Sequence, residues 1–399
     1  MAEILYISSL SSNKLVDCVK KKTGNDPGYA VQKFNRLVVQ GFKHNGVIVN
    51  IYSKPPVNKT VGSNWVLLPS ENEDGLSYNY VRYFNIPVLK DLCVFIGAFF
   101  KVFKFGLFNK TNKAVVCDVL AISMNLGAVL AAKLVGLKIT GIVTDMPGMM
   151  VDFSNNKKST ISKRIINKIN LSYISSYTHY VFLTEQMNSV INKKNKPYIV
   201  MEALCDNTLY EVQNSSVSKV TPRMVMYAGG LDERYGLKLL VDSFRNLDNN
   251  DINLVIYGSG PYAEKLSQVV KEDSRVQYRG VVSNEEILQT ELEATLLVNP
   301  RPTTEKFTQF SFPSKNMEYM ASGTPLLTTK LPGMPKDYYP YVYLFEEESV
   351  RGYATSLKKI LELPNEELEI KGKRAKRFVL ENKNNVVQSG RILNLIFQE

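Results

Sequence analysis

Short apolar runs alternate along this chain with longer segments whose apolar residues recur at the spacing of one helix face. Such alternation is typical of parallel sheets joined by helical crossovers. The pattern therefore predicts an α/β fold made of two open, doubly wound sheets. The runs predict strands at Ile4–Ile7, Val47–Tyr52, Ala114–Asp118, Ile139–Val143, Tyr180–Leu183, Met224–Ala228, Asn253–Tyr257, Val276–Arg279, Ala294–Asn299 and Pro325–Thr328. The longer segments predict helices at Val31–Lys43, Leu126–Leu134, Ile161–Ile174, Leu237–Leu247, Tyr262–Glu272, Asn284–Leu292 and Ser314–Ala321.

A polar segment rich in Ser, Asn and Val, residues 207–222, separates the two series of elements and indicates an extended connector. The chain has 399 residues, more than the ~250–300 at which single cores stop growing. We expect a first domain over 1–205 and a second over 206–382, with the C-terminal helix, 383–399, packing back onto the first. Open sheets bind ligands beyond the carboxyl ends of their strands, so two sheets facing each other would form a cleft.

Charge is distributed unevenly between the two halves. Lys and Arg exceed Asp and Glu by 11 over the whole chain, and the net charge is +14 for residues 1–200 against −3 for the remainder. With 44% hydrophobic and 22% charged residues, the composition excludes a disordered chain. A basic domain indicates an anionic partner. No motif that reads nucleic acid accompanies the charge, so we expect an anionic membrane surface and no nucleic acid.

The segment Val88–Phe108 contains six phenylalanines interspersed with Lys90, Lys101 and Lys104. This pattern favours an interfacial helix that inserts aromatic rings into a bilayer. A second basic stretch, Lys157–Lys168, lies in the same half. The alternative is that the phenylalanines belong to the core and the lysines form a solvated face.

Cysteine and histidine patterns exclude a structural zinc site and a disulfide framework. The four cysteines form no paired spacing, and only two histidines are present. The first residues lack the basic and apolar regions of a signal peptide. The longest apolar run, Leu92–Phe100, is far shorter than the ~20 residues of a membrane span. We expect a cytoplasmic protein peripherally associated with the inner face of the membrane.

Candidate chemistry lies in the predicted helix that Pro313 begins and Gly323 ends. Unpaired N–H groups and the dipole at its start, together with Lys315, would attract a phosphate next to Ser314. Glu318 lies one turn further and could accept two hydroxyl hydrogen bonds from a diol such as a ribose. The alternative is that Lys315 and Glu318 form an ordinary surface i,i+3 pair.

The same segment resembles the donor site of the retaining glycosyltransferases of family 4. Their signature is a Glu, seven residues, a second Glu, and then Ala-x-Gly-x-Pro. Here Phe310–Glu318 occupies the first part of this frame and Glu318–Pro325 the second. Three further segments resemble the family's glycine-rich turns and an adjoining strand, in the same order: Tyr227–Gly236, Ile256–Pro261 and Val276–Gly280.

The resemblance implies the GT-B fold, in which two Rossmann-like domains face each other across a cleft. It implies a UDP- or GDP-sugar donor, transfer with retention to a saccharide or lipid-linked acceptor, and neither a cofactor nor a metal ion. The chain has no Asp-x-Asp signature for a manganese ion. The implied donor-binding residues are Gly229, Gly230, Arg234, Gly258, Ser314, Lys315 and Glu318.

The chain departs from the family pattern at three positions. Phe310 replaces the first Glu of the signature, and Gly230 and Tyr235 replace the family's phosphate-binding Arg and Lys. Arg234, Arg301 and Lys315 could compensate, and we assign Arg301 and Lys315 to stabilising charge on the departing diphosphate. The variant Ser-Phe-Pro-Ser-Lys resembles a subgroup concerned with surface or capsular polysaccharides.

The first half should hold the acceptor. Asp145 follows the predicted strand Ile139–Val143, so it is the candidate for contacting an acceptor hydroxyl. A capping or turn role is the alternative for Asp145. Neither His44 nor His179 lies in this neighbourhood.

Three other functions stay open. An epimerase of the same architecture would need a carboxylate and a histidine pair, which this histidine-poor chain does not favour. An oxidoreductase would need a third glycine after Gly258-Ser-Gly260. A non-catalytic, nucleotide-binding scaffold is compatible with Phe310 in the signature.

Overall fold

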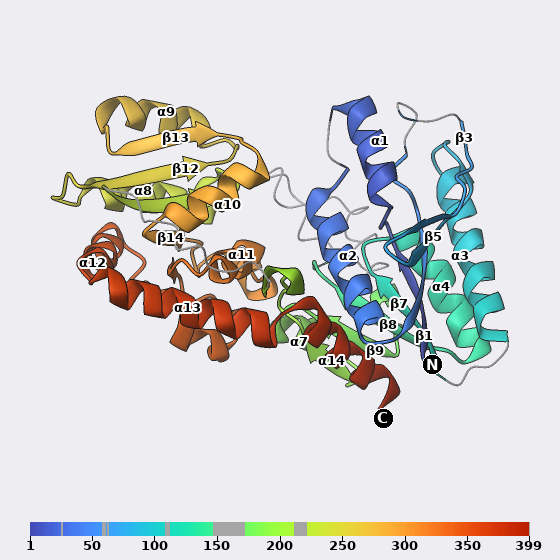
Figure 1. Cartoon of the computed structure of the whole chain (residues 1–399). Helices are drawn as coiled ribbons and strands as arrows, with labels where there is room; N and C mark the ends of the chain where they lie inside the picture. Colours follow the sequence, from blue (N-terminus) through green and yellow to red (C-terminus); the bar gives the residue numbers. More distant parts are fainter. Residues whose placement is uncertain are drawn as a thin grey trace. The chain divides into compact units, whose positions relative to one another are not determined.

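The computed structural model describes residues 1–24, 27–57, 61, 64–107, 112–146, 172–210 and 222–398. The chain divides into two compact units. The first consists of Met1–Leu204 and Asn385–Glu399, and the second consists of Cys205–Asn384. Each is an α/β unit built on a largely parallel sheet (Figure 1).

The first unit contains an eight-stranded sheet in the order β10-β9-β8-β7-β1-β2-β5-β4. All neighbours run parallel except β4, which pairs antiparallel with β5. The strand order reverses between β1 and β7, which is where sheets of this type bind ligands. The strands are β1 (Glu3–Ser8), β2 (Ile48–Ser53), β4 (Glu71–Glu73), β5 (Leu76–Tyr80), β7 (Lys113–Asp118), β8 (Lys138–Val143), β9 (His179–Phe182) and β10 (Tyr198–Val200), with a separate ribbon of β3 (Trp65–Val66) and β6 (Tyr83–Phe84).

Helices flank this sheet, and two of them, α3 and α4, lie side by side (Figure 1). Their close approach depends on Gly127, where a Cβ would lie 2.2 Å from the carbonyl oxygen of Phe95. The C-terminal helix packs against α2, where Asn385 donates to the Leu37 carbonyl and Ser389 to the Val38 carbonyl. The helices are α1 (Asn13–Thr23), α2 (Tyr29–His44), α3 (Leu89–Leu107), α4 (Ile122–Val135), α7 (Glu185–Ile191) and α14 (Asn385–Phe397).

The second unit contains a six-stranded parallel sheet in the order β13-β12-β11-β14-β15-β16. Its order reverses between β11 and β14, so the crevice at their carboxyl ends is the expected ligand position. The strands are β11 (Arg223–Ala228), β12 (Ile252–Tyr257), β13 (Val276–Gly280), β14 (Leu296–Asn299), β15 (Leu326–Thr328) and β16 (Tyr343–Leu344).

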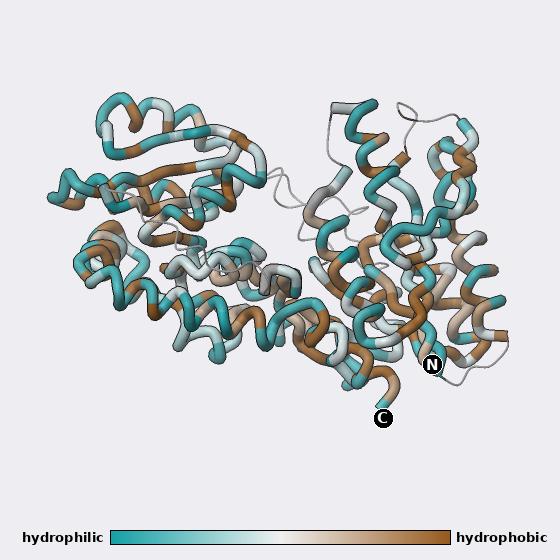
Figure 2. The backbone as a smooth tube through the Cα atoms, in the orientation of Figure 1, coloured by the Kyte–Doolittle hydropathy of each residue, from teal (hydrophilic) through white to brown (hydrophobic). Residues whose placement is uncertain are grey.

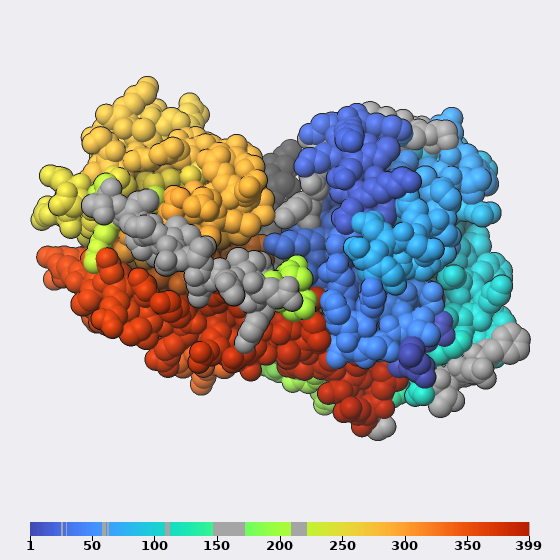
Figure 3. Space-filling model, viewed as in Figure 1, coloured from blue at the N-terminus to red at the C-terminus, as the bar shows by residue number. Residues whose placement is uncertain are grey.

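Helices of the second unit bury one face against its sheet. Figure 2 shows hydrophobic residues along β12 and a largely polar α13, whose outer side is exposed in Figure 3. The helices are α8 (Leu237–Arg245), α9 (Ala263–Glu272), α10 (Asn284–Glu293), α11 (Ser314–Ser322), α12 (Val350–Leu361) and α13 (Asn365–Asn382), with short 3-10 turns η1 (Asn207–Tyr210), η2 (Glu233–Tyr235), η3 (Lys306–Phe310) and η4 (Lys336–Tyr341).

The predicted fold class is confirmed, and the predicted strands and helices within the described residues appear within a few residues of their expected ends. The predicted strand at Ala294–Asn299 starts later, at Leu296, because Ala294 is the C-cap of α10. Most of the predicted helix Ile161–Ile174, the basic stretch Lys157–Lys168 and the connector beyond Tyr210 lie outside the described residues.

We expect Gly127→Ala to lower the free energy of unfolding by about 1–3 kcal/mol, because the added methyl group overpacks the contact between α3 and α4. Helix propensity alone would favour alanine. Gly390→Ala, in α14, is the matched control, since its Cβ would come no closer than 3.2 Å to the Asn45 side chain. Urea unfolding of both variants measures the difference. Equal stabilities would contradict the packing argument.

Candidate functional site

Two glycine-containing turns interlock at the carboxyl ends of β11 and β12. The Gly229 N–H donates to the Tyr257 carbonyl at 3.1 Å, and the Leu231 N–H donates to the Ser259 carbonyl at 2.9 Å. Gly258 has a φ of 127°, and a Cβ there would lie 1.9 Å from the Gly229 carbonyl oxygen. Only glycine fits at position 258, because both the backbone angle and the contact exclude a side chain.

Helix α11 is fixed against this edge by two buried polar side chains. The Tyr319 hydroxyl accepts from the Ala228 N–H at 2.7 Å and donates to the Ala228 carbonyl at 3.2 Å. Asn316 accepts from the Asn299 amide at 2.6 Å and donates to the Thr328 hydroxyl at 3.4 Å. These bonds tie the helix to the ends of β11, β14 and β15. The start of α11 therefore has a defined position beside the β11–β14 crevice.

The first turn of α11 presents Lys315 between two carboxylates. Lys315 Nζ lies 2.7 Å from Glu318 Oε2 and 3.8 Å from Oε1 of Glu291, a fully buried side chain on α10. Ser314 is exposed at the helix start, and no side chain caps this terminus. Lys315 and Glu318 form the i,i+3 pair that the alternative interpretation describes, and their role toward a phosphate and a diol stays a prediction. Glu291 adds a second anion, which holds the ammonium group near the helix N-terminus.

Arg301 follows β14 and lies against the rings of Tyr235 and Phe307, which contact each other edge to face. Its guanidinium carbon is 4.9 Å from the Tyr235 ring centroid and 5.5 Å from that of Phe307. Its Nε is buried without a hydrogen-bond partner, and within the described ranges no carboxylate forms an ion pair with Arg301. Burial lowers the pKa of Arg301. A buried cation without a counter-charge costs free energy, which an anionic ligand would recover.

Arg234, in contrast, already has a carboxylate partner. Its Nε lies 3.1 and 3.2 Å from the two Asp232 oxygens, and its terminal nitrogen lies 2.6 Å from one of them. This hydrogen bonding lowers the pKa of Asp232. The assignment of Arg234 to a diphosphate stays a prediction, and the structure gives its charge a competing partner.

The second unit thus gathers the sequence-predicted donor residues at one edge. Gly229, Gly230 and Gly258 form the interlocked turns, Arg301 follows the adjacent strand, and Ser314, Lys315 and Glu318 lie on α11. Phe310, the residue that replaces the signature Glu, ends η3 and is half-buried. The edge offers a helix start that no side chain caps, two cations, and the carboxylates of Glu318 and Glu291. The cations and the helix start suit a phosphate or diphosphate ester, and Glu318 suits a neighbouring diol.

In the first unit, two carboxylates follow the neighbouring strands β7 and β8. Asp118 ends β7 and is almost fully buried, accepting from the Asn35 amide at 3.0 Å and the Leu120 N–H at 3.1 Å. Asn35 in turn accepts from the Tyr6 hydroxyl. Asp145 lies two residues beyond β8, and burial, with a smaller contribution from Asp118, raises its pKa to about 6.

Sequence reasoning missed the residues that hold the site rather than the residues that would contact a ligand. Glu291 and Asn299 lie outside the signature and Asn316 is one of its variable positions, and each gains its partner only when α10, β14 and α11 pack together. Asp118 was included only as the last residue of a predicted strand. The sequence could have indicated Asp118, because it ends an otherwise apolar strand and carboxylates are seldom buried without a role.

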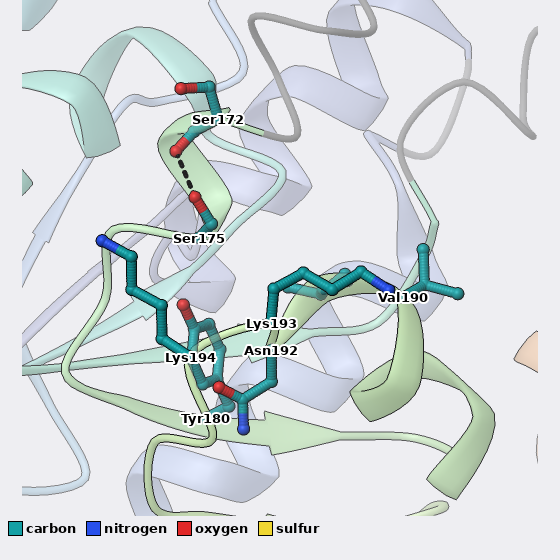
Figure 4. Close-up of a pocket in the computed structure, with 8 residues that line it drawn as sticks. Ser172, Ser175, Tyr180, Val190, Asn192, Lys193 and Lys194 are labelled. Carbon is teal, nitrogen blue, oxygen red and sulfur yellow. Dashed lines mark hydrogen bonds between the residues drawn. The ribbon is translucent and has the colours of Figure 1, made fainter.

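The first unit contains a cavity of about 280 Å³ that neither Asp118 nor Asp145 lines (Figure 4). Tyr180, near the start of β9, and Asn192–Lys194, which precede β10, line it. It therefore lies near the amino ends of these strands, whereas ligands of doubly wound sheets bind at the carboxyl ends. Over the residues described, no group of three or more His, Cys, Asp and Glu side chains could hold a metal ion.

Residues 211–378 match the family described as Glycosyl transferases group 1. No curated protein sequence matches the chain. The matched residues include the interlocked turns, Arg301 and the whole of α11. The resemblance inferred from the motifs of the second half is thus supported at the level of glycosyltransferases, and the assignment to family 4 and its subgroup stays a prediction.

Solved structures are similar along essentially the full length. Sucrose-phosphate synthase from Thermosynechococcus elongatus is 14% identical with a TM-score of 0.62, covering 100% of both chains. Anabaena HepE in complex with UDP is 10% identical with a TM-score of 0.62, also covering 100% of both. The lipopolysaccharide outer core galactosyltransferase WaaB is 15% identical with a TM-score of 0.60, covering 99% of both. The fold is that of the GT-B glycosyltransferases.

We expect Asp145→Asn to stabilise the protein at pH 8 but not at pH 4. The native carboxyl group holds its proton up to about pH 6, whereas the unfolded group loses it near pH ~4. Ionisation of the folded group therefore costs free energy that appears as pH rises through this window. Allowing for partial solvent screening, the free energy of unfolding of Asp145→Asn should exceed that of the wild type by about 1–2 kcal/mol above pH 6. Urea unfolding at both pH values measures it.

The exposed Asp17 on α1 supplies the control, since Asp17→Asn should show the same small effect at both pH values. A stability difference for Asp145→Asn that is independent of pH would contradict the buried-carboxylate argument.

We expect Arg301→Met to weaken binding of inorganic diphosphate by about 10- to 100-fold, the loss of one charge-assisted hydrogen bond. Its free energy of unfolding should stay equal or rise, because the substitution removes a half-buried charge that has no carboxylate partner in the described part of the chain. Calorimetric titration and urea unfolding measure the two effects. Arg245→Met, which removes an exposed cation paired with Glu272, should leave diphosphate binding unchanged. A destabilised Arg301→Met with unchanged binding would overturn this assignment.

Proposed function

We propose that this protein is a retaining glycosyltransferase that transfers a sugar from a nucleoside-diphosphate sugar to a hydroxyl group of a saccharide. The observation that carries the proposal is Arg301 at the strand-order reversal, a half-buried side chain with a buried Nε and no carboxylate partner among the described residues. The match of residues 211–378 to a glycosyltransferase family supports the reaction type. Similar structures in complex with UDP or UDP-glucose support the donor class, UDP- or GDP-sugar.

The proposed donor pose follows from the charges of the second unit. The diphosphate lies against Gly229, Gly230 and the start of α11, and Arg301 offsets its charge. Glu318 accepts hydrogen bonds from the ribose hydroxyls. As the diol engages Glu318, Lys315 exchanges one of its two carboxylate contacts for the diphosphate, while Glu291 keeps the ammonium group in place.

The proposed reaction needs neither a metal ion nor a cofactor. The bond between the anomeric carbon and the diphosphate oxygen breaks, and a bond to the acceptor oxygen forms on the same face of the sugar. The acceptor proton passes to the departing diphosphate. Lys315, Arg301 and the α11 dipole stabilise the negative charge that develops on the diphosphate.

For the acceptor we propose a saccharide, carried on a lipid, that is bound by the first unit. Asp145 would orient its hydroxyl, because a partly buried carboxylate beyond β8 lies at the ligand-binding edge of the sheet. Cell-surface polysaccharide assembly is the proposed process. It is consistent with the Ser-Phe-Pro-Ser-Lys variant at 311–315 and, as a similar fold, with a lipopolysaccharide galactosyltransferase.

A lipid-linked acceptor places the protein at a membrane. We propose a cytoplasmic protein that associates peripherally with the anionic inner face through its basic first half. Over the described residues, no helix is both long and apolar enough to cross a bilayer. Helix α3 supports surface association, because Phe100 is 63% exposed and Leu92 51% exposed. The other phenylalanines of α3 are half-buried, so the core alternative accounts for part of this pattern.

We expect UDP or GDP to raise the melting temperature of the wild-type protein and Glu318→Ala to lose that shift. A ligand at 100 times its dissociation constant stabilises by ~2.7 kcal/mol. A thermal-shift panel with UDP, GDP, CDP, ADP and NAD identifies the base. Glu362→Ala, which removes an exposed carboxylate paired with Lys358, is the control.

Stabilisation by NAD alone, or by none of the five, would contradict the proposed donor site. Product analysis then separates the remaining alternatives. Sugar transfer to an acceptor supports the transferase, an altered sugar without transfer indicates an epimerase, and nucleotide binding without any turnover indicates a scaffold.

A further inference from the structure

The first unit contains a second cavity, of about 410 Å³, beside helix α3. It is separate from the carboxyl groups described above, and no step of the proposed transfer uses it. It lies where the carboxyl halves of β2 and β5 and the segment after β5 meet one face of α3. Its lining includes Tyr52, Ser70, Asn79, Arg82, Gly97 and Lys101.

The charges of this cavity are positive. Arg82 and Lys101 line it, and no lining residue carries a carboxylate. Within the described ranges, neither cation lies within ion-pair distance of Asp or Glu. Burial, with a smaller contribution from Lys104, lowers the pKa of Lys101, and the carboxylate that opposes this shift, Glu3, is itself 3.4 Å from Lys113. The cavity therefore favours an anion.

Neutral donors complete the lining. Burial raises the pKa of Tyr52 to about 12, against an opposing effect of Arg82, so its hydroxyl stays protonated and can donate. Ser70 donates to Asn79 Oδ1 at 2.9 Å, which orders the opposite wall. Gly97 keeps the space open, because a Cβ there would lie 2.9 Å from the Tyr52 hydroxyl and 2.7 Å from Val81. Two cations and a hydroxyl donor suit a phosphate group.

An exposed apolar stripe runs along α3 next to this cavity. Ile96 and Phe100 immediately precede the lining residues Gly97 and Lys101, and they are 43% and 63% exposed. Leu92 and Leu107 extend the stripe along the same helix. A phosphate-sized basic cavity beside exposed apolar side chains matches the two chemical parts of a phospholipid, a charged head group and hydrocarbon chains.

We propose that the cavity lined by Arg82 and Lys101 binds the phosphate group of an anionic membrane lipid, while Ile96 and Phe100 lie among the lipid chains. This inference rests on the membrane association proposed above and gives it a specific site. It is independent of the donor site in the second unit.

The experiment measures binding of the full-length protein to vesicles of phosphatidylcholine with and without phosphatidylglycerol, by co-sedimentation. We expect binding to the phosphatidylglycerol vesicles and at least about tenfold weaker binding for the double variant Arg82→Ala, Lys101→Ala, since each basic residue contributes ~1 kcal/mol at an anionic surface. The charge-matched control is Lys20→Ala, Lys21→Ala, which removes two exposed lysines at the end of α1 and should weaken binding less than about twofold.

Three results would overturn the proposal. The two double variants could lose binding equally, which would indicate a diffuse charge effect. The wild type could bind vesicles of phosphatidylcholine alone equally well, which would indicate apolar insertion only. Calorimetric titration with glycerol 3-phosphate could show binding that depends on Arg82 and Lys101 without vesicle binding, which would assign the cavity to a soluble phosphate ester.

Folding and the donor site are monitored on the same samples. Both double variants should melt near the wild-type temperature, because they replace partly exposed residues. Their stabilisation by UDP or GDP should also be unchanged. Loss of the nucleotide effect in the wild type would contradict the donor site alone, and loss of the Arg82 and Lys101 effect would contradict the lipid site alone.

Discussion

The second unit partly buries one cation, Arg301, for which the described residues supply no carboxylate partner. Arg301 is instead partly desolvated against the rings of Tyr235 and Phe307. Such an arrangement costs stability in the free protein, since a buried charge is expensive unless compensated. It persists because the loop after β11 and the residues after β14 lock together, with Gly236 pressed against the Pro300 carbonyl. The site is thus prepared for an anion before one arrives.

Much of the fold could be predicted because its signals are local. Apolar runs such as Met224–Ala228 predict buried parallel strands. The glycine at position 258 predicts a tight turn, and the structure shows that a side chain would not fit there. Helices α12 and α13 were not predicted, although α12 buries Tyr353, Leu357 and Ile360 at helical spacing. The ribbon of β3 and β6 was not predicted because strands of two residues are too short to show an alternating pattern. The residues proposed to contact the donor were predicted from motif spacing. Glu291, which shapes the charge of Lys315, was not, because only the packing of α10 against α11 makes them neighbours.

The two units have similar sheets but differ in the charged groups at the edge where the strand order reverses. In the second, the reversal of strand order carries cations and exposed N–H groups. In the first, the corresponding edge carries Asp118 and Asp145, and burial raises the pKa of both carboxyl groups. One edge therefore favours anions, and the other favours neutral hydroxyl-bearing molecules. This difference in electrostatics, rather than a difference in topology, suits the units to separate partners.

The position of Lys315 between Glu291 and Glu318 has a consequence for selectivity. While both carboxylates hold it, the ammonium group contributes little positive potential to its surroundings. In the proposed pose, a diol that binds Glu318 weakens the contact between Glu318 and Lys315, and the positive potential of Lys315 then acts on the phosphates of the same ligand. Binding of the diol therefore strengthens binding of the phosphates. A deoxyribose nucleotide, with one hydroxyl fewer, would forfeit more than a single hydrogen bond. In the proposed donor pose, discrimination between ribose and deoxyribose therefore depends in part on Lys315, a group that touches neither sugar.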